Sequence, residues 1–519
     1  MSGVWWREGV FYQIYPRSFQ DSNGDGIGDL PGITSRLDHL NDGTPRSLGV
    51  DAIWLSPFYR SPMADFGYDV SDYTDVDPTF GTLADFDRLL AEAHRRGIRV
   101  IVDLVPNHTS DQHPWFVASR ASRDDPKRSW YVWADPRPRG GPPNNWRSIF
   151  ERAGAAWTLD RRTGQYYLHH FLAEQPDLNW RNEDVRNAID EVMRFWLDRG
   201  VDGFRVDVAH GLLRDPNLRD NPPFQIFGWP RLVNWDLDEV HEIHRRWRSI
   251  LDSYPGDRMA VGEVNPRSLR RLVRYYGQDD ELHLSFNFGF LARPWRAEAF
   301  RRVVERWEAL LPRASWPDYT LSNHDRSRAI TRYGEDRARV AAMMLLTLRG
   351  TPFLYYGEEI GMTDVAIPRD RVVDVAGRDP ERTPMQWEGK PNGDFTSGAA
   401  WLPMGDCARR NVAAQREDSD SLLSFYRRLI WRRKGSPALR RGSYRTLPAP
   451  RGVFAYAREA DGERVVVALN FTKSRRRMPL GAGSATVLVG TQLAREGDEV
   501  DLRRVELAAD EGIVASLVR

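Results

Sequence analysis

Short runs of apolar residues alternate along the chain with longer segments in which apolar and polar positions follow a helical period. The short runs are rich in Val, Ile, Leu, Phe and Tyr, which is typical of strands buried on both faces. They are Phe11–Tyr15, Ala52–Leu55, Arg99–Leu104, Gly203–Val206, Met259–Glu263, His283–Phe286, Tyr319–Ser322 and Pro352–Tyr355. The longer segments place apolar residues three and four positions apart and predict amphipathic helices at Leu83–Arg96, Glu183–Arg199, Leu237–Tyr254, Glu298–Leu311 and Asp336–Leu348.

Eight buried strands, each followed by a helical segment, predict an α/β protein built on a (β/α)₈ TIM barrel. The same alternation is compatible with a doubly wound parallel sheet, which we keep as the weaker alternative.

Two departures from this alternation indicate further domains. The chain between Leu104 and Gly203 is far longer than a barrel loop and carries a hairpin-like Trp157–Phe171. We therefore expect an inserted small domain at 106–179, between barrel segments 1–105 and 180–435. After a helix at Ser421–Lys434, short alternating strands predict a C-terminal antiparallel β-sandwich at 436–519. Its expected strands are Val453–Arg458, Arg464–Asn470, Ser484–Leu488, Val500–Leu507 and Ile513–Leu517.

Charge and composition exclude several classes of partner. The chain has 74 Lys and Arg against 73 Asp and Glu, so its net charge of +1 gives no general attraction to nucleic acid or an anionic membrane. The longest apolar run, Val340–Leu348, is far shorter than the ~18 residues of a spanning helix. No secretory leader precedes the barrel and Cys407 is the single cysteine, so we expect a cytoplasmic protein. The 19 Trp and 18 Tyr provide flat rings that suit sugar binding.

Charged residues gather at the carboxyl ends of the predicted strands, where TIM barrels carry their chemistry. They are Asp103 with Asn107 and His108, Arg205 with Asp207, Glu263, and His324 with Asp325. There is no Cys/His metal cluster and no phosphate-binding loop, so we expect no organic cofactor. Converging carboxylates suit glycosidic cleavage, in which one acid protonates the leaving oxygen and another attacks the sugar.

These motifs resemble the α-amylase family, glycoside hydrolase family 13. The four regions are Asp103–His108, Gly203–Asp207, Val261–Glu263 and Ser322–Asp325. The resemblance implies that Asp207 is the nucleophile, Glu263 the general acid/base and Asp325 the third acid. It also implies that Arg205 keeps Asp207 ionised and that His108 and His324 bind sugar hydroxyls.

Three further segments resemble the oligo-1,6-glucosidase and α-glucosidase subfamily: Gln175–Trp180, Gly67–Tyr73 and Arg378–Trp387. By that resemblance Tyr68 and Asp69 bind the non-reducing glucose, and an arginine, either Arg378 or Arg382, pairs with Asp69 to close the pocket.

The preferred linkage is left open by conflicting positions. Val208, after the nucleophile, is the residue that goes with α-1,6 cleavage in this subfamily, whereas Ala209–Leu212 is more similar to α-glucosidases acting on α-1,4 bonds. Region four reads Ser322-Asn323 where the oligo-1,6-glucosidases have two asparagines.

The loop Asp21–Asp29 predicts a structural Ca²⁺ site. Asp21, Asn23, Asp25 and Asp29, with the Ile27 carbonyl, have the spacing of the first part of an EF-hand loop. Gly32 stands where that loop would have its bidentate Glu.

We therefore expect a retaining, exo-acting α-glucosidase that releases glucose from short α-1,4- or α-1,6-linked oligosaccharides. One alternative is a transglycosylating or isomerising relative such as a trehalose synthase. A catalytically silent transporter heavy chain is rejected, because this chain keeps all three acids and lacks a membrane helix. The sequence does not determine the oligomeric state.

Overall fold

The computed structural model describes residues 3–150, 154–222, 232–266, 268–312 and 314–517. Its centre is a parallel sheet of eight short strands in the order β11-β10-β9-β5-β2-β1-β13-β12. These are β1 (Phe11–Ile14), β2 (Ala52–Leu55), β5 (Arg99–Leu104), β9 (Gly203–Val206), β10 (Met259–Gly262), β11 (Leu284–Ser285), β12 (Asp318–Thr320) and β13 (Thr351–Tyr355).

The order follows the chain around a circle and has no point at which it reverses, so the fold is the expected nearly closed barrel and not a doubly wound sheet. Within the described residues no ladder joins β11 to β12, and the barrel keeps a seam there. Asp318, which begins β12, is fully buried at this seam.

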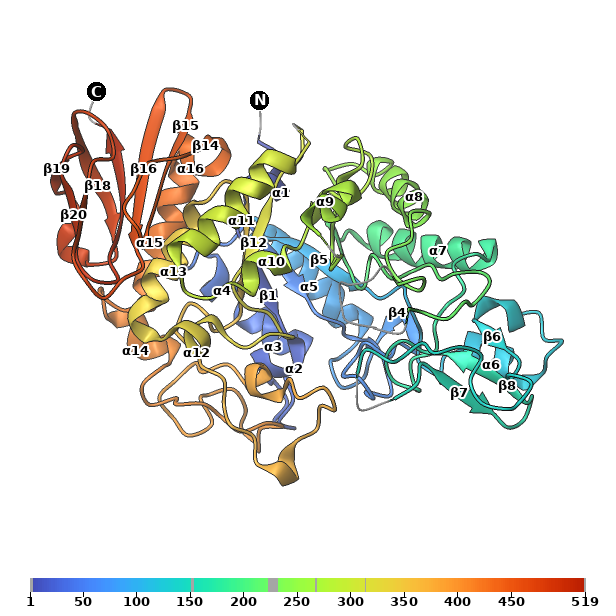
Figure 1. The fold of residues 1–519 in the computed structure, drawn as a ribbon. Helices are drawn as coiled ribbons and strands as arrows, with labels where there is room; N and C mark the ends of the chain where they lie inside the picture. The colour runs from blue at the N-terminus through green and yellow to red at the C-terminus, as the bar shows by residue number, and fades with distance from the viewer. Residues whose placement is uncertain (1–2, 151–153, 223–231, 267, 313, 518–519) are drawn as a thin grey trace.

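Helices surround the strands as the apolar periodicity predicts (Figure 1). The main ones are α5 (Leu83–Arg95), α7 (Glu183–Arg199), α8 (Val240–Asp252), α11 (Ala297–Leu310) and α13 (Ala338–Thr347). Thr82 and Asp85 form a capping box that starts α5, and Gly200 at φ 104° ends α7. Shorter helical turns complete the ring: α1 (Trp5–Glu8), α2 (Pro16–Phe19), α3 (Leu30–Ser35), α4 (Leu37–Leu40), α9 (Leu269–Leu272), η3 (Val273–Tyr276), α10 (Phe288–Leu291), α12 (Ala329–Tyr333) and η4 (Glu335–Arg337).

The expected insertion after β5 is a small antiparallel sheet with the order β6-β8-β7. Its hairpin is β7 (Trp157–Asp160) and β8 (Gln165–Leu168), joined by β6 (Trp133–Ala134), and α6 (Pro114–Ala121) and η1 (Arg128–Trp130) precede it. A second hairpin, β3 (Tyr59–Arg60) with β4 (Asp72–Val76), follows β2 and was not predicted. Both hairpins follow the carboxyl ends of barrel strands.

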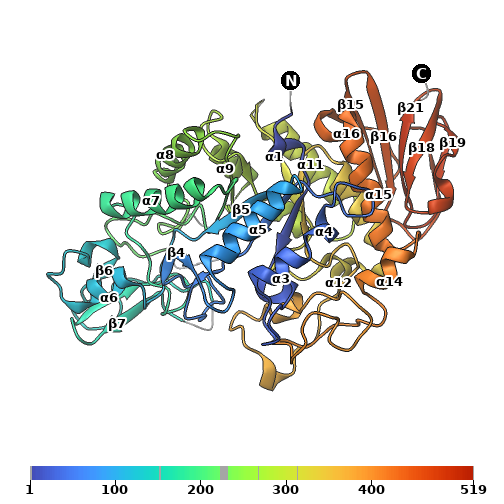
Figure 2. The same ribbon diagram turned by 180° about the vertical axis from the view of Figure 1, so that it is seen from behind.

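The C-terminal part is an antiparallel six-stranded sheet (Figure 2), and a two-stranded sheet packs on one of its faces. One face packs with α13 and α15 (Leu422–Gly435). The other packs with β17 (Arg476–Met478) and β20 (Val505–Leu507) around Met478, Val505 and Leu507. The six-stranded sheet contains β14 (Ser443–Thr446), β15 (Val453–Ala460), β16 (Glu463–Asn470), β18 (Ser484–Gly490), β19 (Glu499–Asp501) and β21 (Gly512–Leu517).

One predicted strand in this region was wrong. Val500–Leu507 is two strands, because the chain turns after Asp501: β19 pairs with β18, and β20 (Val505–Leu507) pairs with β17 (Arg476–Met478). The edge strand β14 was also missed, since its residues are at most half-buried and carry no apolar run.

A long segment with little regular structure connects β13 to the C-terminal helices. It contains η5 (Arg369–Arg371) and η6 (Asp379–Arg382), and it ends at α14 (Val412–Glu417); α16 (Pro437–Arg441) and η7 (Leu493–Arg495) are the remaining turns. None of the helices in the described ranges has the length and apolar character needed to cross a membrane.

Candidate active site

Arg205 binds three carboxylates at the carboxyl end of the barrel. Its Nη1 donates to Asp103 Oδ1 at 2.6 Å and to Asp207 Oδ1 at 2.8 Å, and its Nη2 donates to Glu263 Oε2 at 2.5 Å. The acids come from the ends of β5, β9 and β10, which are neighbours in the sheet. The structure thus gathers the residues of the first three motifs around one buried guanidinium.

One guanidinium cannot neutralise three carboxylates, and the pKa values of Asp207 and Asp103 show this. Burial raises the pKa of Asp207 well above its usual value, Arg205 opposes the rise, and the charge of Glu263 adds to it. Burial likewise raises the pKa of Asp103 to about 6 despite the contact with Arg205. Burial and the mutual repulsion of the acids therefore disfavour full ionisation of the carboxylates around Arg205. The Glu263 side chain is 21% exposed against 7% for Asp207, so Glu263 faces the opening.

Asp325 is held by a different pair of arginines. Its Oδ1 accepts from Arg378 Nη1 and from Arg382 Nη2, both at 3.0 Å. Burial opposes ionisation of Asp325, but the charges of Arg378 and Arg382 outweigh it, and its pKa falls well below the usual range. Asp325 is thus a fixed negative charge, whereas burial disfavours the charge of Asp207.

Tyr68 and His324 form the wall between these two groups of acids. Their rings are parallel within 1° at 5.4 Å, and the Tyr68 hydroxyl lies 2.7 Å from His324 Nε2 and 3.2 Å from Asp103 Oδ2. The Gln13 amide nitrogen lies 2.7 Å from His324 Nδ1, so Nδ1 accepts and Nε2 carries the proton. Burial lowers the pKa of His324 well below its usual value, and the ring is neutral.

His108 is also buried and neutral, because burial lowers its pKa. Its Nε2 lies 3.0 Å from the Tyr68 carbonyl, and Asn107 Nδ2 lies 3.0 Å from its Nδ1. His108 therefore supports the backbone that presents Tyr68.

Arg378 pairs with Asp65, an acid that the sequence analysis missed, and this pair closes one side of the site. Its Nη2 donates to Asp65 Oδ1 at 2.5 Å and to Asp374 Oδ1 at 2.7 Å while its Nη1 holds Asp325. Gln175, from the insertion, donates to the other Asp65 oxygen at 3.0 Å. Arg378 therefore links the loop after β2 to the loop after β13, on either side of β1 in the sheet.

The expected pair between Asp69 and an arginine was wrong. Asp69 is fully buried, and its carboxylate accepts from the Ser61 hydroxyl and from the backbone N–H groups of Ala64 and Asp65. It shapes the turn that presents Asp65 and makes no ion pair in the described part of the chain. The sequence does contain a second acid, Asp65, four positions earlier in the same loop, and this was the signal that could have indicated the partner of the arginine.

Arg382 lies beneath Asp325, not in the pocket. It is fully buried, and its Nε donates to the His324 carbonyl at 2.7 Å. This settles which arginine bridges the two loops: Arg378 does, and Arg382 orients the fourth motif from behind.

Val208 adopts a strained backbone conformation directly after Asp207. Its φ is 45°, which is rare for a β-branched residue and typical of functional sites. Its N–H lies 3.4 Å from Glu263 Oε2. A Cβ at Gly211 would lie 2.0 Å from the Trp235 ring and 2.6 Å from the Val208 side chain, so only glycine fits there. Val208 thus lies beside Glu263, the expected general acid/base.

Asp177, in the segment that resembles the subfamily signature, belongs to a buried support network. Its carboxylate accepts from Arg214 Nη2 at 2.8 Å and lies 2.5 Å from His170 Nδ1. Arg214 also donates to Asn107 Oδ1 at 2.7 Å, which connects the insertion to the first motif.

The loop Asp21–Asp29 lies next to the long segment after β13. Asp21 accepts from the N–H groups of Gly24 and Gly26 and from the Thr396 hydroxyl, and Asp25 Oδ1 accepts from Ile27 N. The donor set contains only oxygens, which Ca²⁺ prefers. Among the described residues no group of three or more His, Cys, Asp or Glu has the spacing to hold a metal. Ca²⁺ binding therefore stays a prediction.

The similarity to known proteins extends over the same four motifs. The alpha-amylase catalytic domain matches residues 13–442, which covers all four motifs. The chain belongs to the α-amylase family. Its relatives also identify this family member as a glycoside hydrolase. It is 44% identical over 504 residues to a probable alpha-glucosidase of Rhizobium meliloti (strain 1021), and the match covers 90% of this chain and 89% of that protein. It is 40% identical over 523 residues to an oligo-1,6-glucosidase of Parageobacillus thermoglucosidasius, covering 91% of each.

Solved structures of the same family include enzymes with other activities. The α-glucosyl transfer enzyme XgtA has a TM-score of 0.92 at 42% identity, with both chains fully covered. The trehalulose synthase MutB from Pseudomonas mesoacidophila MX-45 has a TM-score of 0.93 at 35% identity, again with full coverage. The family member is thus α-glucosidase-like, and similarity alone does not distinguish hydrolysis from transfer.

Proposed function

We propose that this family member is a retaining, exo-acting α-glucosidase that releases terminal α-D-glucose from short α-1,4- or α-1,6-linked oligosaccharides. The observation that carries the proposal is the pairing of Asp207 and Glu263 on one guanidinium, beside a pocket side closed by Arg378 and Asp65. Retaining enzymes hold their two carboxyl groups ~5–5.5 Å apart, and we expect that separation here.

In the first step Asp207 attacks the anomeric carbon while Glu263 donates its proton to the glycosidic oxygen. The C–O bond to the leaving sugar breaks, and a glucosyl ester forms on Asp207. This step requires an ionised Asp207 and a protonated Glu263. Arg205 Nη1 lies 2.8 Å from Asp207 Oδ1 and favours the ionised nucleophile, and Glu263, the more exposed of the two acids, faces the leaving group.

In the second step Glu263, now ionised, takes a proton from water. The resulting hydroxide attacks the same carbon, the ester bond breaks, and Asp207 leaves as a carboxylate with net retention of configuration. Asp325, held ionised by Arg378 and Arg382, accepts hydrogen bonds from ring hydroxyls and stabilises positive charge at the anomeric centre.

The exo mode follows from the Arg378–Asp65 bridge. The bridge closes the rim between the loops after β2 and β13 with a buried ion pair that can bind a terminal sugar hydroxyl. A longer chain would have to separate this pair, which costs several kcal/mol when one buried charge loses its partner.

Glucosyl transfer is the second candidate, because XgtA and MutB share the whole fold. Transfer uses the same ester on Asp207 and replaces water with a sugar hydroxyl. The chemistry of the acids is identical, so the outcome depends on what occupies the acceptor side.

The same proposal includes a structural Ca²⁺ held by Asp21, Asn23, Asp25, the Ile27 carbonyl and Asp29, remote from the chemistry. It also includes action in the cytoplasm, since a chain with one cysteine forms no internal disulfide and suits a reducing compartment.

The test is a panel of maltose, isomaltose, trehalose and sucrose with products followed by proton NMR. We expect α-glucose as the first product from maltose or isomaltose. The leaving glucose of maltose is already a mixture of anomers, so retention is read as an excess of the α anomer over that mixture, and an excess of the β anomer contradicts it. Internal cleavage of amylose contradicts the exo mode, and new disaccharides without glucose identify a transferase or isomerase.

A further inference from the structure

A cavity of about 580 Å³ opens beside Glu263, outside the glucose pocket. Val264 and Asn265, which follow Glu263 in the chain, line it together with Asn287 at the end of β11. Helices α9, α10 and α11 surround it, and they lie side by side in Figure 1. The cavity thus lies at the carboxyl ends of two barrel strands, on the side of the proposed proton donor.

The lining is basic and carries no compensating acid. Arg293, Arg302 and Arg306 line the cavity, and none of its described lining residues is Asp or Glu. Arg293 Nε donates to the Gly289 carbonyl at 2.5 Å and Arg302 Nε to the Glu298 carbonyl at 3.1 Å. Across the described ranges, none of the three has a carboxylate within 4.0 Å, in contrast to most arginines around the site.

An uncharged hydrogen-bond donor lies in the same cavity wall. Asn287 is only 4% exposed, and its Oδ1 caps α10 by accepting from Phe290 N at 3.1 Å. Its Nδ2 is buried and has no hydrogen-bond partner among the described residues. A buried amide N–H₂ without an acceptor costs free energy, so an acceptor supplied by a ligand is favoured.

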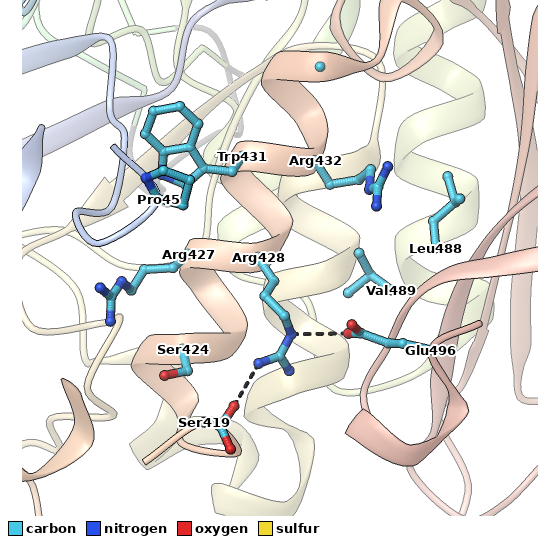
Figure 3. Close-up of a pocket in the computed structure, with 11 residues that line it drawn as sticks. Pro45, Ser419, Ser424, Arg427, Arg428, Trp431, Arg432, Leu488, Val489 and Glu496 are labelled. Atoms are coloured by element: carbon cyan, nitrogen blue, oxygen red, sulfur yellow. Dashed lines mark hydrogen bonds and ion pairs between the residues drawn. The ribbon is translucent and has the colours of Figure 1, made fainter. Parts of the chain in front are cut away.

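Another arginine-rich cavity, between α15 and β18, shows the difference (Figure 3). There Arg428 Nε donates to Glu496 at 3.0 Å and its Nη1 donates to the Ser419 carbonyl at 2.7 Å. That cavity contains its own counter-charge, whereas the one beside Glu263 does not.

We propose that the cavity lined by Arg293, Arg302, Arg306 and Asn287 binds an oxyanion, a carboxylate or a phosphate group. Guanidinium groups bind these anions with paired, charge-assisted hydrogen bonds, and the Asn287 amide supplies a further donor. The anion has two possible sources: a free oxyanion, or an acidic group on the leaving sugar of an α-glucoside. The second source rests on the proposed function, in which the leaving group departs on the Glu263 side.

The first experiment measures binding without reference to activity. Inorganic phosphate is titrated at constant ionic strength while thermal unfolding is followed. A ligand that binds only the folded state raises Tm in a saturable way. We expect this rise in the unchanged protein and in the control Arg432→Ala, from the cavity of Figure 3, and its loss in Arg302→Ala/Arg306→Ala. These are partly or fully exposed side chains, so the variants should fold. An equal Tm rise in all three proteins, or in none, overturns the proposal.

The second experiment identifies the source of the anion. Maltobionate and maltitol differ in that the leaving group of maltobionate carries a carboxylate. If the leaving group supplies the anion, the ratio of kcat/KM for maltobionate over maltitol falls about tenfold in the double variant, the scale of one charged hydrogen bond. An unchanged ratio together with phosphate binding identifies a free oxyanion. Glucose release from maltose or isomaltose tests the proposed function separately, and the phosphate result decides this inference whatever that outcome.

Discussion

Replacement of Asp65 by asparagine tests the corrected pocket directly. Asp65 is buried, and its two oxygens accept from Arg378 at 2.5 Å and from Gln175 at 3.0 Å. An asparagine side chain at this position would keep the shape and one acceptor but would lose the charge that Arg378 faces. A hydrogen bond to a charged group contributes about 1.5–3 kcal/mol, and about 1.4 kcal/mol is tenfold. For Asp65→Asn we therefore expect kcat/KM for maltose to fall by about 10- to 100-fold.

Asp69→Asn is the matched control, since it makes the same change four positions away. Asp69 accepts from Ser61 and two backbone N–H groups, and burial raises its pKa to about 6, so a neutral side chain is tolerated. Asparagine has one acceptor oxygen and loses at least one of these bonds, about 1 kcal/mol of stability. We expect a small decrease in Tm and a change in kcat/KM of less than about threefold.

The assay is the release of glucose from maltose at several concentrations, with thermal unfolding of each variant. Full activity in Asp65→Asn, together with a large loss of kcat/KM at unchanged Tm in Asp69→Asn, would refute the assignment of Asp65 as the acid that closes the pocket.

Four further outcomes are expected. Asp207→Asn should lower kcat by about 10³ or more with little change in Tm, because no other group can form the ester; near-normal turnover contradicts the nucleophile assignment. Burial raises the pKa of Asp318 to about 8 from 3.8, so the folded state keeps a proton that the unfolded chain loses. The free energy of unfolding of the protein should thus fall as pH rises from about 4 to 8. Asp318→Asn should make this free energy less dependent on pH, as measured by denaturation at several pH values; an equal pH dependence in both proteins counts against the prediction. A chelator should lower Tm if the loop Asp21–Asp29 holds Ca²⁺, and unchanged melting with no metal by elemental analysis opposes this. Val208→Ala and Val208→Thr should raise the ratio of maltose to isomaltose cleavage, measured as kcat/KM; an unchanged ratio removes Val208 from linkage selection.

The sequence predicted the barrel and the position of its acids because both depend on local information. A strand buried on both faces is a short apolar run, and the residue at its carboxyl end lies on the rim wherever the strand lies in the barrel. Arg205, Asp207 and Glu263 could therefore be placed together before any contact was known.

The partner of Arg378 could not be predicted in the same way. Asp65 and Asp69 share one loop, and only the turn between β3 and β4 decides which carboxylate points outward. That hairpin is short, with β3 only two residues long, and carries no apolar run that a pattern could detect. The sequence also did not reveal that Val500–Leu507 is divided into β19 and β20. The alternation of apolar and polar residues continues through the turn after Asp501, so the pattern does not show where the first strand ends.

The bridge between Arg378 and Asp65 also orders events during synthesis of the chain. The two residues are 313 positions apart, and Arg378 follows the last barrel strand. When the first seven barrel strands and the motif after them have left the ribosome, Asp65, Asp207, Glu263 and Asp325 are already outside it. Arg378, which joins the two ends of the rim, is not. The proposed glucose pocket is complete only after the final strand docks beside the first, so a nascent or truncated chain should present its acids without a closed pocket. Retention on an immobilised glucose analogue would then report completion of the barrel, which secondary-structure content alone does not.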